Sequence, residues 1–559
     1  MNRAAKTLKK WNEKLDGIWR EEGNGRRGGA AAKRPVRERA GSFVREHRLE
    51  LLFIAMMGCL LFFLAWVLPF NGGPDEAARY LVPKYIYKHG TLPHGGDPEI
   101  RMKIWGISYA FHPILPYIIG GYLMKAVGLF NSSDHALLMA ARFVNILIGM
   151  GFYWYVLQIS RVLFKRNVFR VYFVALLALL PQLLYLFVYV NTDGIALFST
   201  AMILYYWLVG LERRWDRGSC TGLAIGVSCC ALSYFNAYGF ALFSVILFAG
   251  SLIVFYGRRG VKECIRIILQ RGIFITAIVF LLSGWWFIRC AVLYDGDFLG
   301  LNAPNYYAEK YADEEYKPSV KKSVQEQGVP LDEMLRNEAD GGMEWKITTY
   351  RSTIGFFGFF EYPLGLDIYE IHKRLFRLGV LGVLLYPLLA VLWYMKRGVC
   401  RLAVKRGWRR RWGQPSACGS VLAKPAMTVP GIKLHPANFC LLQFSLGCCM
   451  IIPIFLSLYY SYTDDFQPQG RYIMTMIIPV MYFTAAGTER LMTLCFRKWF
   501  VRLLMVPILY AVLHVFLAAF ISVYLPSYCE AFAWMADIRF PWFSNQGWLV
   551  QLLYLFIPG

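Results

Sequence analysis

The chain has 559 residues, of which 57% are hydrophobic and 17% are charged, which is more apolar surface than a soluble core of this length needs. This composition excludes an ordinary soluble protein and indicates an all-α, polytopic membrane protein. The net charge of +24 does not favour nucleic-acid binding, because the basic residues gather in short segments between apolar runs, as in the cytoplasmic loops of membrane proteins.

The N-terminal segment is basic and has a Gly- and Ala-rich centre. We predict that residues 1–48 are a cytoplasmic tail, partly disordered and attracted to anionic lipid headgroups. The apolar stretch 51–69 that follows shows no small-residue cleavage site, so we expect it to remain as the first span. The 13 cysteines lie mostly in apolar runs without metal-binding spacing, which argues against a disulfide framework.

Eleven apolar segments are long enough to cross a bilayer at about 1.5 Å per residue. Residues 111–130 are also apolar, but counting them as a span would move every later basic loop to the outer face. We therefore expect a juxtamembrane or re-entrant helix there. The eleven predicted spans are 51–69, 136–160, 168–190, 194–211, 220–238, 240–257, 272–292, 375–395, 437–459, 471–488 and 500–524.

Two long loops, 71–135 and 293–374, fall on the outer face in this topology, and both are longer than a connector needs. These loops hold most of the acids, so we expect any site to face outward. The sequence thus predicts three parts, which are the tail 1–48, a transmembrane domain 49–524 that carries both loops, and a C-terminal amphipathic or outer segment 525–559.

Asp75 and Glu76 stand side by side just after the first span, where an apolar chain is expected to avoid acids unless they have a function. Adjacent carboxylates can supply a general base, a metal ligand or a cation site. Their repulsion raises one pKa toward the working pH, unless Arg79 or a metal offsets it. Asp193 opens a later span on the same side, where a helix N-cap and a functional acid are both consistent with its position.

Basic side chains on the outer side are candidates for binding an anionic group. Arg289 lies late in an apolar run, at an insertion cost of roughly 2.5 kcal/mol, which indicates an anionic or acidic partner. Arg471, followed by Tyr472 at the start of a span, either reaches to lipid headgroups or binds a phosphodiester with two parallel hydrogen bonds. Each of the other candidates is also consistent with an ordinary loop residue, and they are Arg79, His94, His112 and Arg351.

The order and common sidedness of these motifs resemble the GT-C superfamily of polytopic glycosyltransferases. The resemblance covers about residues 50–490 and is most like a poorly characterised bacterial branch of predicted membrane proteins. The motifs that carry it are Pro74-Asp75-Glu76, the helix that begins His112-Pro113, Asn191-Thr192-Asp193, Trp286-Phe287-Ile288-Arg289, Gly296-Asp297-Phe298-Leu299-Gly300 and Gln469-Gly470-Arg471-Tyr472.

The resemblance implies an inverting enzyme that moves a hexose or pentose from a polyprenyl-phosphate carrier to an envelope glycan, lipid or protein. The reaction would take place at the outer face of the bacterial plasma membrane, with a cytoplasmic N-terminus. Asp75 would be the general base, Asp193 a second acid, and Glu76 either the neighbour of the base or the ligand of a divalent cation such as Mg²⁺ or Mn²⁺.

The resemblance also implies that arginines bind the carrier phosphate, and Arg289, Arg351 and Arg471 are the candidates. The bacterial branch often has a histidine three residues after the glutamate, where this chain has Arg79. Any role of that histidine is therefore either lost or passed to Arg79, His94 or His112.

Other functions remain open at the level of sequence. A polysaccharide polymerase or ligase would also use outward-facing arginines, but it has less need for an acidic pair after the first span. A secondary transporter or flippase places charges at mid-membrane and often has duplicated halves, and neither pattern is evident. A non-catalytic envelope assembly protein is a further alternative, and an inactive glycosyltransferase relative would look almost identical by sequence. The sequence leaves the sugar, the acceptor, the metal requirement and the oligomeric state undetermined.

Overall fold

The computed structural model describes residues 36–405, 432 and 434–538. These residues are mostly helical, and the strands within them form one short antiparallel pair, β1 (Phe356–Phe357) with β2 (Tyr362–Pro363). The predicted all-α, polytopic fold class is confirmed. Most of the predicted tail 1–48, and residues 539–559 of the predicted C-terminal segment, lie outside the described residues.

Seven helical segments in this part of the chain are long and apolar enough to cross a membrane. They are built on α3 (Arg48–Val67), α6 (Asp134–Leu163), α9 (Asp193–Arg213), α11 (Tyr238–Tyr256), α12 (Val261–Leu293), α17 (Pro436–Thr463) and α19 (Lys498–Ala519). The predicted number of about eleven spans is reached when α16 (Leu366–Lys405), a helix of 40 residues, and the shorter or less apolar helices of the other three predicted spans are counted.

The remaining four predicted spans are also helical, but an apolar profile does not show where their helices begin, break and end. Predicted span 168–190 is divided before Pro181, because proline lacks the N–H that a continuous helix requires. Another predicted span, 220–238, contains a helix of 15 residues, about 22 Å long and shorter than the hydrocarbon core. The helices in question are α7 (Asn167–Ala178), α8 (Pro181–Leu186), α10 (Arg217–Ala231), α16 (Leu366–Lys405) and α18 (Ile477–Cys495).

The apolar segment 111–130 contains α5 (Leu115–Gly128), which has 14 residues. Its length of about 21 Å is too short to cross the hydrocarbon core. α5 packs against α6 and against α4 (Glu76–His89), the helix that follows the acidic pair. The structure thus agrees with the prediction of a juxtamembrane helix in the first long loop.

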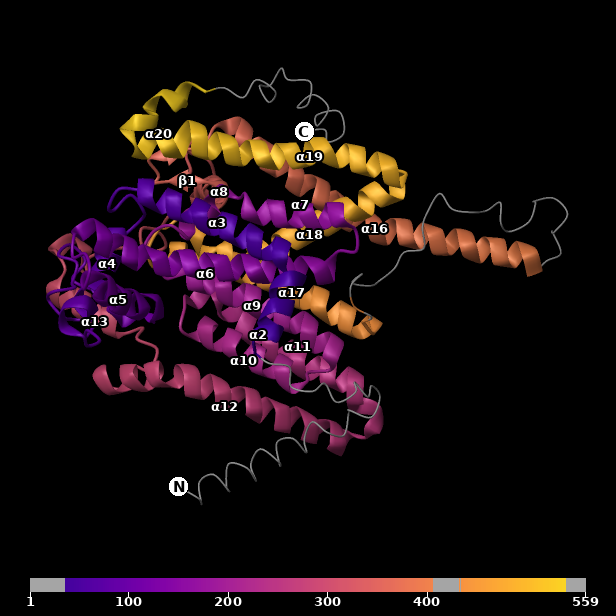
Figure 1. Cartoon of the computed structure of the whole chain (residues 1–559), viewed down its shortest axis with the longest axis horizontal. Helices are drawn as coiled ribbons and strands as arrows, with labels where there is room; N and C mark the ends of the chain where they lie inside the picture. Colours follow the sequence, from indigo (N-terminus) through magenta and orange to yellow (C-terminus); the bar gives the residue numbers. More distant parts are fainter. Residues whose placement is uncertain (1–35, 406–431, 433, 539–559) are drawn as a thin grey trace.

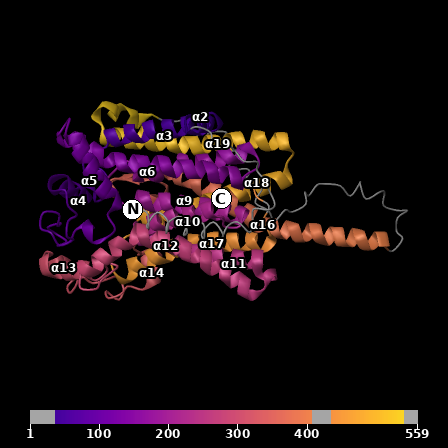
Figure 2. The same cartoon turned by 60° about the horizontal axis from the view of Figure 1, so that its bottom comes forward.

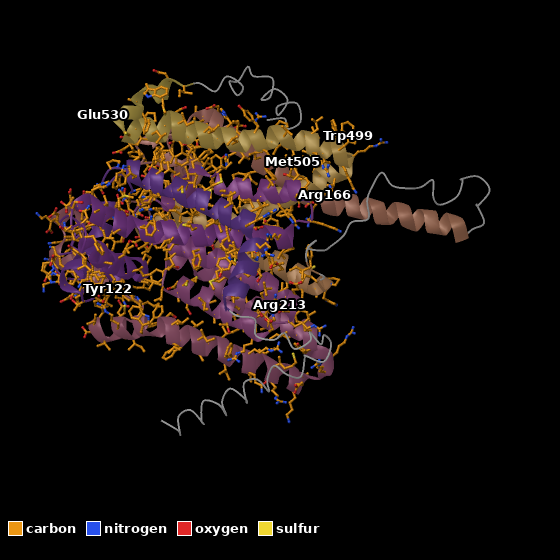
Figure 3. All side chains as sticks on the ribbon, viewed as in Figure 1. Tyr122, Arg166, Arg213, Trp499, Met505 and Glu530 are labelled. Carbon is orange, nitrogen blue, oxygen red and sulfur yellow. The ribbon has the colours of Figure 1, made fainter. Side chains whose placement is uncertain are left out.

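The helices run mostly along one axis, and the two ends of the bundle differ (Figures 1 and 2). One end, which we call the site end, bears α4, α5 and the loop helix α13 (Ala303–Tyr311). The opposite end holds the basic turns that adjoin Arg166, just before α7, and Arg213, the last residue of α9 (Figure 3). The segregation of long loops from basic turns is the one that the loop-charge rule requires.

The depth of the helices in the bundle varies widely. In α9 the most apolar window is 83% buried, whereas in α12 it is 6% buried. α9 is therefore central, and α12 lies at the edge of the bundle with apolar side chains such as Ile273, Phe280 and Leu281 turned outward. In a membrane protein such a face is expected to contact lipid.

The second long loop folds back onto other parts of the site end. The backbone N–H of Asp313 donates to the carbonyl of Ile104 in the first loop at 3.0 Å. Lys321 forms an ion pair with Asp465, beyond the end of α17, at 2.8 Å. The loop is thus an ordered cover that joins distant segments. It contains α14 (Leu331–Leu335) and α15 (Trp345–Ile354), and the described chain ends with α20 (Leu525–Tyr528) and the 3₁₀ turn η11 (Glu530–Asp537).

Candidate active site

A sharp turn between α3 and α4 sets the position of Asp75. Asn71 and Asp75 both have the left-handed backbone conformation, with φ of 62° and 61°, which is uncommon outside glycine but best tolerated by Asn and Asp. The Asn71 side chain accepts a hydrogen bond from the backbone of Ala77 at 3.0 Å and holds the first turn of α4. Strained conformations of this kind concentrate at functional sites.

Glycine is required where this turn meets the chain before α9. A Cβ atom on Gly73 would lie 2.4 Å from the ring of Tyr189. The carbonyl of Gly72 accepts hydrogen bonds from the hydroxyls of Tyr185 and Tyr528, the latter at 3.1 Å. The turn is therefore anchored against the bundle on one side while Asp75 projects from the other.

The Asp75 carboxylate lies beside two guanidinium groups. Nη2 of Arg471 donates to Asp75 Oδ2 at 2.8 Å, and Nη2 of Arg79 lies 3.7 Å from the same oxygen. Burial alone would raise the pKa of Asp75, but the charges of Arg471 and Arg79 outweigh it and hold the pKa below its usual value. The side chain of Asp75 is 30% exposed and those of both arginines are 6% exposed, so Asp75 is the accessible member of the group.

Arg79 connects Asp75 to the second predicted acid. Its Nη1 lies 3.2 Å from Asp193 Oδ2, and its guanidinium packs over the ring of Tyr109 at 4.8 Å. Asp193 is the first residue of α9 and is buried. We call Asp75, Arg79, Asp193 and Arg471 the ion cluster, in which two acids balance two arginines.

Arg471 is held in place by its neighbours in the chain. Gly470 packs against α15, where a Cβ atom would lie 2.3 Å from the backbone nitrogen of Thr353. Nη2 of Arg471 is 3.1 Å from the hydroxyl of Tyr472, and the ring of Tyr472 stacks on that of Tyr234 with centroids 5.7 Å apart. The guanidinium therefore has little freedom to move.

Several buried donors at the ion cluster have no hydrogen-bond partner within the described part of the chain. They are Nε and Nη1 of Arg471, Nε of Arg79 and the hydroxyl of Tyr189, whose electrostatic neighbours include Arg471 and Asp193. Buried donors are normally satisfied, and a guanidinium meets carboxylate or phosphate oxygens most strongly. The cluster thus has unused capacity to bind an anion.

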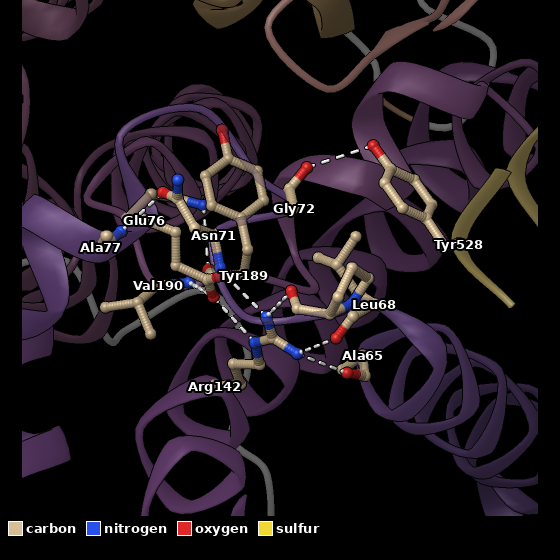
Figure 4. A network of polar contacts seen from close by, with 12 residues as sticks. Ala65, Leu68, Asn71, Gly72, Glu76, Ala77, Arg142, Tyr189, Val190 and Tyr528 are labelled. Carbon is tan, nitrogen blue, oxygen red and sulfur yellow. Dashed lines mark hydrogen bonds and ion pairs between the residues drawn. The ribbon is translucent and has the colours of Figure 1, made fainter. Parts of the chain in front are cut away.

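Glu76 meets a different arginine from Asp75 and forms an ion pair with Arg142 inside the bundle (Figure 4). Its Oε1 and Oε2 lie 2.7 and 2.6 Å from Nε and Nη2 of Arg142, and both side chains are 0% exposed. The same two oxygens accept hydrogen bonds from the backbone N–H groups of Asn71 and Val190, each at 3.1 Å.

The guanidinium of Arg142 also binds the end of α3. Its remaining N–H groups donate to the carbonyls of Ala65, Leu68 and Pro69 at 2.6 to 2.8 Å. Every donor of Arg142 is therefore used, and the pair joins α3, α4, α6 and the segment before α9.

A metal ion does not fit at Glu76. Its four oxygen lone-pair positions are taken by Arg142, Asn71 and Val190. Across the residues that the structure describes, no three His, Cys, Asp or Glu side chains form a group that could hold a metal ion. The expectation of a divalent cation at Glu76 thus has no support in the donor set around it.

His112 lies beside the ion cluster, just after the short turn η2 (Tyr109–Phe111). Burial and the charge of Arg79 lower its pKa to about 4, so the imidazole is neutral at pH 7. Its ring meets that of Phe235 edge to face, with centroids 6.0 Å apart.

The other predicted site residues lie elsewhere at the site end. Nη2 of Arg289 donates to the carbonyl of Pro93 at 2.6 Å, and the neighbouring His94 packs against Tyr294 with ring centroids 5.1 Å apart. Arg351 lies on α15 over the ring of Tyr369 at 5.9 Å. Among the described residues, no hydrogen bond or ion pair joins His94, Arg289 or Arg351 to the ion cluster.

The structure thus brings together one part of the predicted set, namely Asp75, Arg79, Asp193, Arg471 and Tyr472, with His112 beside them. Sequence reasoning missed Arg142, although it stands within an apolar run and the insertion-cost argument used for Arg289 applies to it equally. Tyr109, which lies against Arg79, gave no signal, because a tyrosine in an outer loop is ordinary.

No protein-family model and no curated protein sequence matches the chain. Among solved structures, it is similar to the oligosaccharyltransferase of Archaeoglobus fulgidus in the apo form, with a TM-score of 0.43 and 14% identity over 84% of this chain and 55% of that chain. It is also similar to ArnT from Cupriavidus metallidurans in the apo state, with a TM-score of 0.40 and 13% identity over 91% of this chain and 69% of that chain.

A third similar structure is the archaeal oligosaccharyltransferase AglB from Archaeoglobus fulgidus in complex with an inhibitory peptide and a dolichol-phosphate. The TM-score is 0.38 and the identity 12%, over 88% of this chain and 57% of that chain. This protein therefore spans little more than half the length of the archaeal proteins. Likenesses of this size assign neither a family nor a function, and what the site can do follows from the ion cluster itself.

Proposed function

We propose that the protein is a membrane glycosyltransferase that moves a sugar from a polyprenyl-phosphate carrier to an envelope acceptor, with the ion cluster as its active site. The observation that carries the proposal is the buried guanidinium of Arg471, which lies 2.8 Å from Asp75 and has two nitrogens without a partner among the described residues. A base for an incoming hydroxyl next to donors for a departing phosphate is what displacement at an anomeric carbon requires.

In this proposal Asp75 is the general base that takes the proton of the acceptor hydroxyl. It is the exposed member of the ion cluster, and its contacts with both arginines fall on one oxygen, Oδ2. Arg471 and Arg79 bind the carrier phosphate, and Asp193 orients Arg79 through their contact at 3.2 Å. Phosphate binding by two fixed guanidinium groups needs no metal at Glu76.

Glu76 and Arg142 have a positioning role in the same proposal. Glu76 follows Asp75 directly in the chain, and its fully used hydrogen bonds fix the first residue of α4. The turn that carries Asp75 is therefore tied to three helices of the bundle, which is how a catalytic group is held to the geometry that its reaction needs.

We place the site end on the outer face of the bacterial plasma membrane. The basic turns with Arg166 and Arg213 lie at the opposite end of the bundle (Figure 3), and such turns are retained on the cytoplasmic side. The acceptor would then be an envelope glycan, lipid or protein outside the cell, and the N-terminal tail would be cytoplasmic.

Sugar transfer by the purified protein in lipid vesicles tests the proposal, with polyprenyl-phosphate hexoses and pentoses as donors and envelope extract as acceptor. Asp75→Asn is expected to abolish transfer while the variant still folds and still binds the carrier. A matched control is Asp332→Asn, because Asp332 is an exposed acid of the second outer loop whose ion pair, within the described part of the chain, is with Arg336. Transfer at the wild-type rate by Asp75→Asn would remove Asp75 from the catalytic role.

A further inference from the structure

We propose that Arg471 masks the Asp75 carboxylate until a phosphate group takes its place, so that the arginine exchanges Asp75 for the donor and thereby frees the base. The identity of the phosphate as a carrier phosphate rests on the proposed function. The exchange itself rests on how Arg471 and Asp75 are held.

Arg471 uses only one of its three guanidinium nitrogens for hydrogen bonds to the described residues. Nη2 faces both Asp75 Oδ2, at 2.8 Å, and the Tyr472 hydroxyl, at 3.1 Å. Nε and Nη1 are buried and have no partner among the described residues. An anion that reaches these two nitrogens gains charge-assisted hydrogen bonds at once and then competes with Asp75 for the same positive charge.

Arg471 and Asp75 differ in how freely they can move. Arg471 is 6% exposed and is fixed between the close contact of Gly470 with Thr353 and the stacked ring of Tyr472. Asp75 is 30% exposed and lies at a turn with left-handed backbone. When an anion arrives, the carboxylate is therefore the group that gives way.

The ion cluster is balanced in charge before an anion binds. Asp75 and Asp193 neutralise Arg79 and Arg471, so a phosphodiester adds one negative charge in excess. Asp193 is buried against Arg79 at 3.2 Å, whereas Asp75 lies 3.7 Å from that arginine. Asp75 also lies 2.8 Å from Arg471, but it is 30% exposed, whereas Asp193 is 6% exposed. Asp75 can therefore turn toward water, and it is the acid that the added charge displaces.

The exchange changes Asp75 from a weak base into a stronger one. Among the described residues, the charged and titratable groups near Asp75 are Arg79 from α4, Tyr109 from η2, Tyr117 from α5, Tyr189 from the segment before α9, and Arg471 and Tyr472 from the segment before α18. Arg471 and Arg79 keep the pKa of Asp75 low in the unliganded cluster. Once phosphate neutralises Arg471, that pKa rises toward the range in which a carboxylate accepts a proton effectively.

Binding of polyprenyl phosphate to the purified protein in nanodiscs tests the exchange, with the neutral polyprenol as control ligand. Asp75→Asn removes the competing charge, so we expect polyprenyl phosphate to bind about five-fold more tightly, as for loss of an ion pair worth about 1 kcal/mol. The gain is expected to vanish when Arg471→Gln is also present. Unchanged or weaker binding by Asp75→Asn would overturn the exchange, as would an equal gain in the Arg471→Gln background.

A second measurement uses the wild-type protein and so does not depend on the folding of a variant. In protein labelled with isotopic aspartate, polyprenyl phosphate is expected to shift an infrared carboxylate band that polyprenol leaves in place. A spectrum that is identical with both ligands would contradict the release of Asp75.

The exchange and the proposed function fail in different ways. A protein that transfers no sugar but shows the coupling between Asp75 and Arg471 would refute the glycosyltransferase and keep the exchange. A protein that transfers sugar without this coupling would refute the exchange alone.

Discussion

Glu76 and Arg142 form a fully buried, two-point ion pair, with oxygen–nitrogen distances of 2.7 and 2.6 Å (Figure 4). Through this pair, the Glu76 side chain is held apart from that of Asp75, although the two acids are adjacent in the sequence. Asp75 adopts the left-handed conformation before α4, and Glu76 is the first residue of that helix, so their side chains diverge and meet different arginines. The expected rise of one pKa through mutual repulsion is therefore offset, and the pKa of Asp75 is lowered instead by Arg471 and Arg79 despite its burial.

Removal of Arg142 is expected to destabilise the whole site end. Arg142→Ala leaves Glu76 as a buried, unpaired charge, which typically costs about 3 to 5 kcal/mol. Thermal unfolding in detergent measures the loss. The double variant Glu76→Leu with Arg142→Met removes both charges and is expected to recover part of the stability. An unchanged unfolding temperature for Arg142→Ala would contradict the anchoring role of the pair.

Loss of Arg471 is expected to raise the donor concentration needed for sugar transfer. Arg471→Ala removes the charge-assisted hydrogen bonds assigned to the phosphate, worth about 1.5 to 3 kcal/mol, or roughly ten- to a hundred-fold in KM for the lipid-phosphate sugar. Arg351→Ala is the matched control, because Arg351 packs over Tyr369 and forms no hydrogen bond or ion pair with the ion cluster among the described residues. Identical donor dependence of Arg471→Ala and the parent would refute the phosphate assignment.

The fold class could be predicted from the sequence because apolar run length and loop charge report directly on a membrane environment. Those signals could not place the breaks within an apolar stretch. Apolarity alone does not show that residues 168–190 divide before Pro181, or that α10 is only 15 residues long. Chain breaks of this kind depend on local backbone chemistry within a uniformly hydrophobic stretch.

The site was only partly predictable, because its decisive contacts are distant in the chain. Asp75 and Arg471 are 396 residues apart, and the motifs supplied both residues but not their contact. Insertion cost selected Arg289 as a residue that needs a partner. The structure gives its Nη2 a backbone carbonyl at 2.6 Å, while its Nη1 is buried without a hydrogen-bond partner among the described residues. The same argument applied to Arg142 would have found the partner of Glu76.

The acid limb of the pH profile is expected to depend on whether the donor is bound. In the free enzyme the pKa of Asp75 lies below its usual value of 3.8, so the carboxylate stays ionised until the pH falls below that value. With phosphate on Arg471 the pKa rises, and Asp75 is protonated at a higher pH. Because kcat/KM for the donor reports the free enzyme and kcat the complex, we expect the acid limb of kcat at the higher pH.

Rates measured at low and at saturating donor, from about pH 3 to about pH 8, provide this comparison, because the pKa of a carboxyl group in a protein lies within that range. His112 has a pKa of about 4, so His112→Gln serves as a background without its titration. Acid limbs that coincide for kcat and kcat/KM would contradict a change in the environment of Asp75 on donor binding.

A methyl group at Gly470 is expected to damage the site without touching a charged residue. The Cβ atom of Gly470→Ala would lie 2.3 Å from the backbone nitrogen of Thr353, a contact that backbone atoms relieve only by moving. Because Arg471 is the next residue, the shift moves its guanidinium away from Asp75. A displacement of about 1 Å costs of the order of a hundred-fold in rate, so transfer is expected to fall by about that factor.

Gly447→Ala is the matched control for this last substitution, since a Cβ atom there meets nothing within 4 Å. Sugar transfer and the affinity for polyprenyl phosphate are measured for both variants, with thermal unfolding to separate a local shift from a general loss of structure. If Gly470→Ala retains the transfer rate and phosphate affinity of Gly447→Ala, then the close contact with α15 does not position Arg471. Loss of both properties at a similar unfolding temperature would assign the effect to the position of the guanidinium, because the substitution leaves the charges of the ion cluster intact.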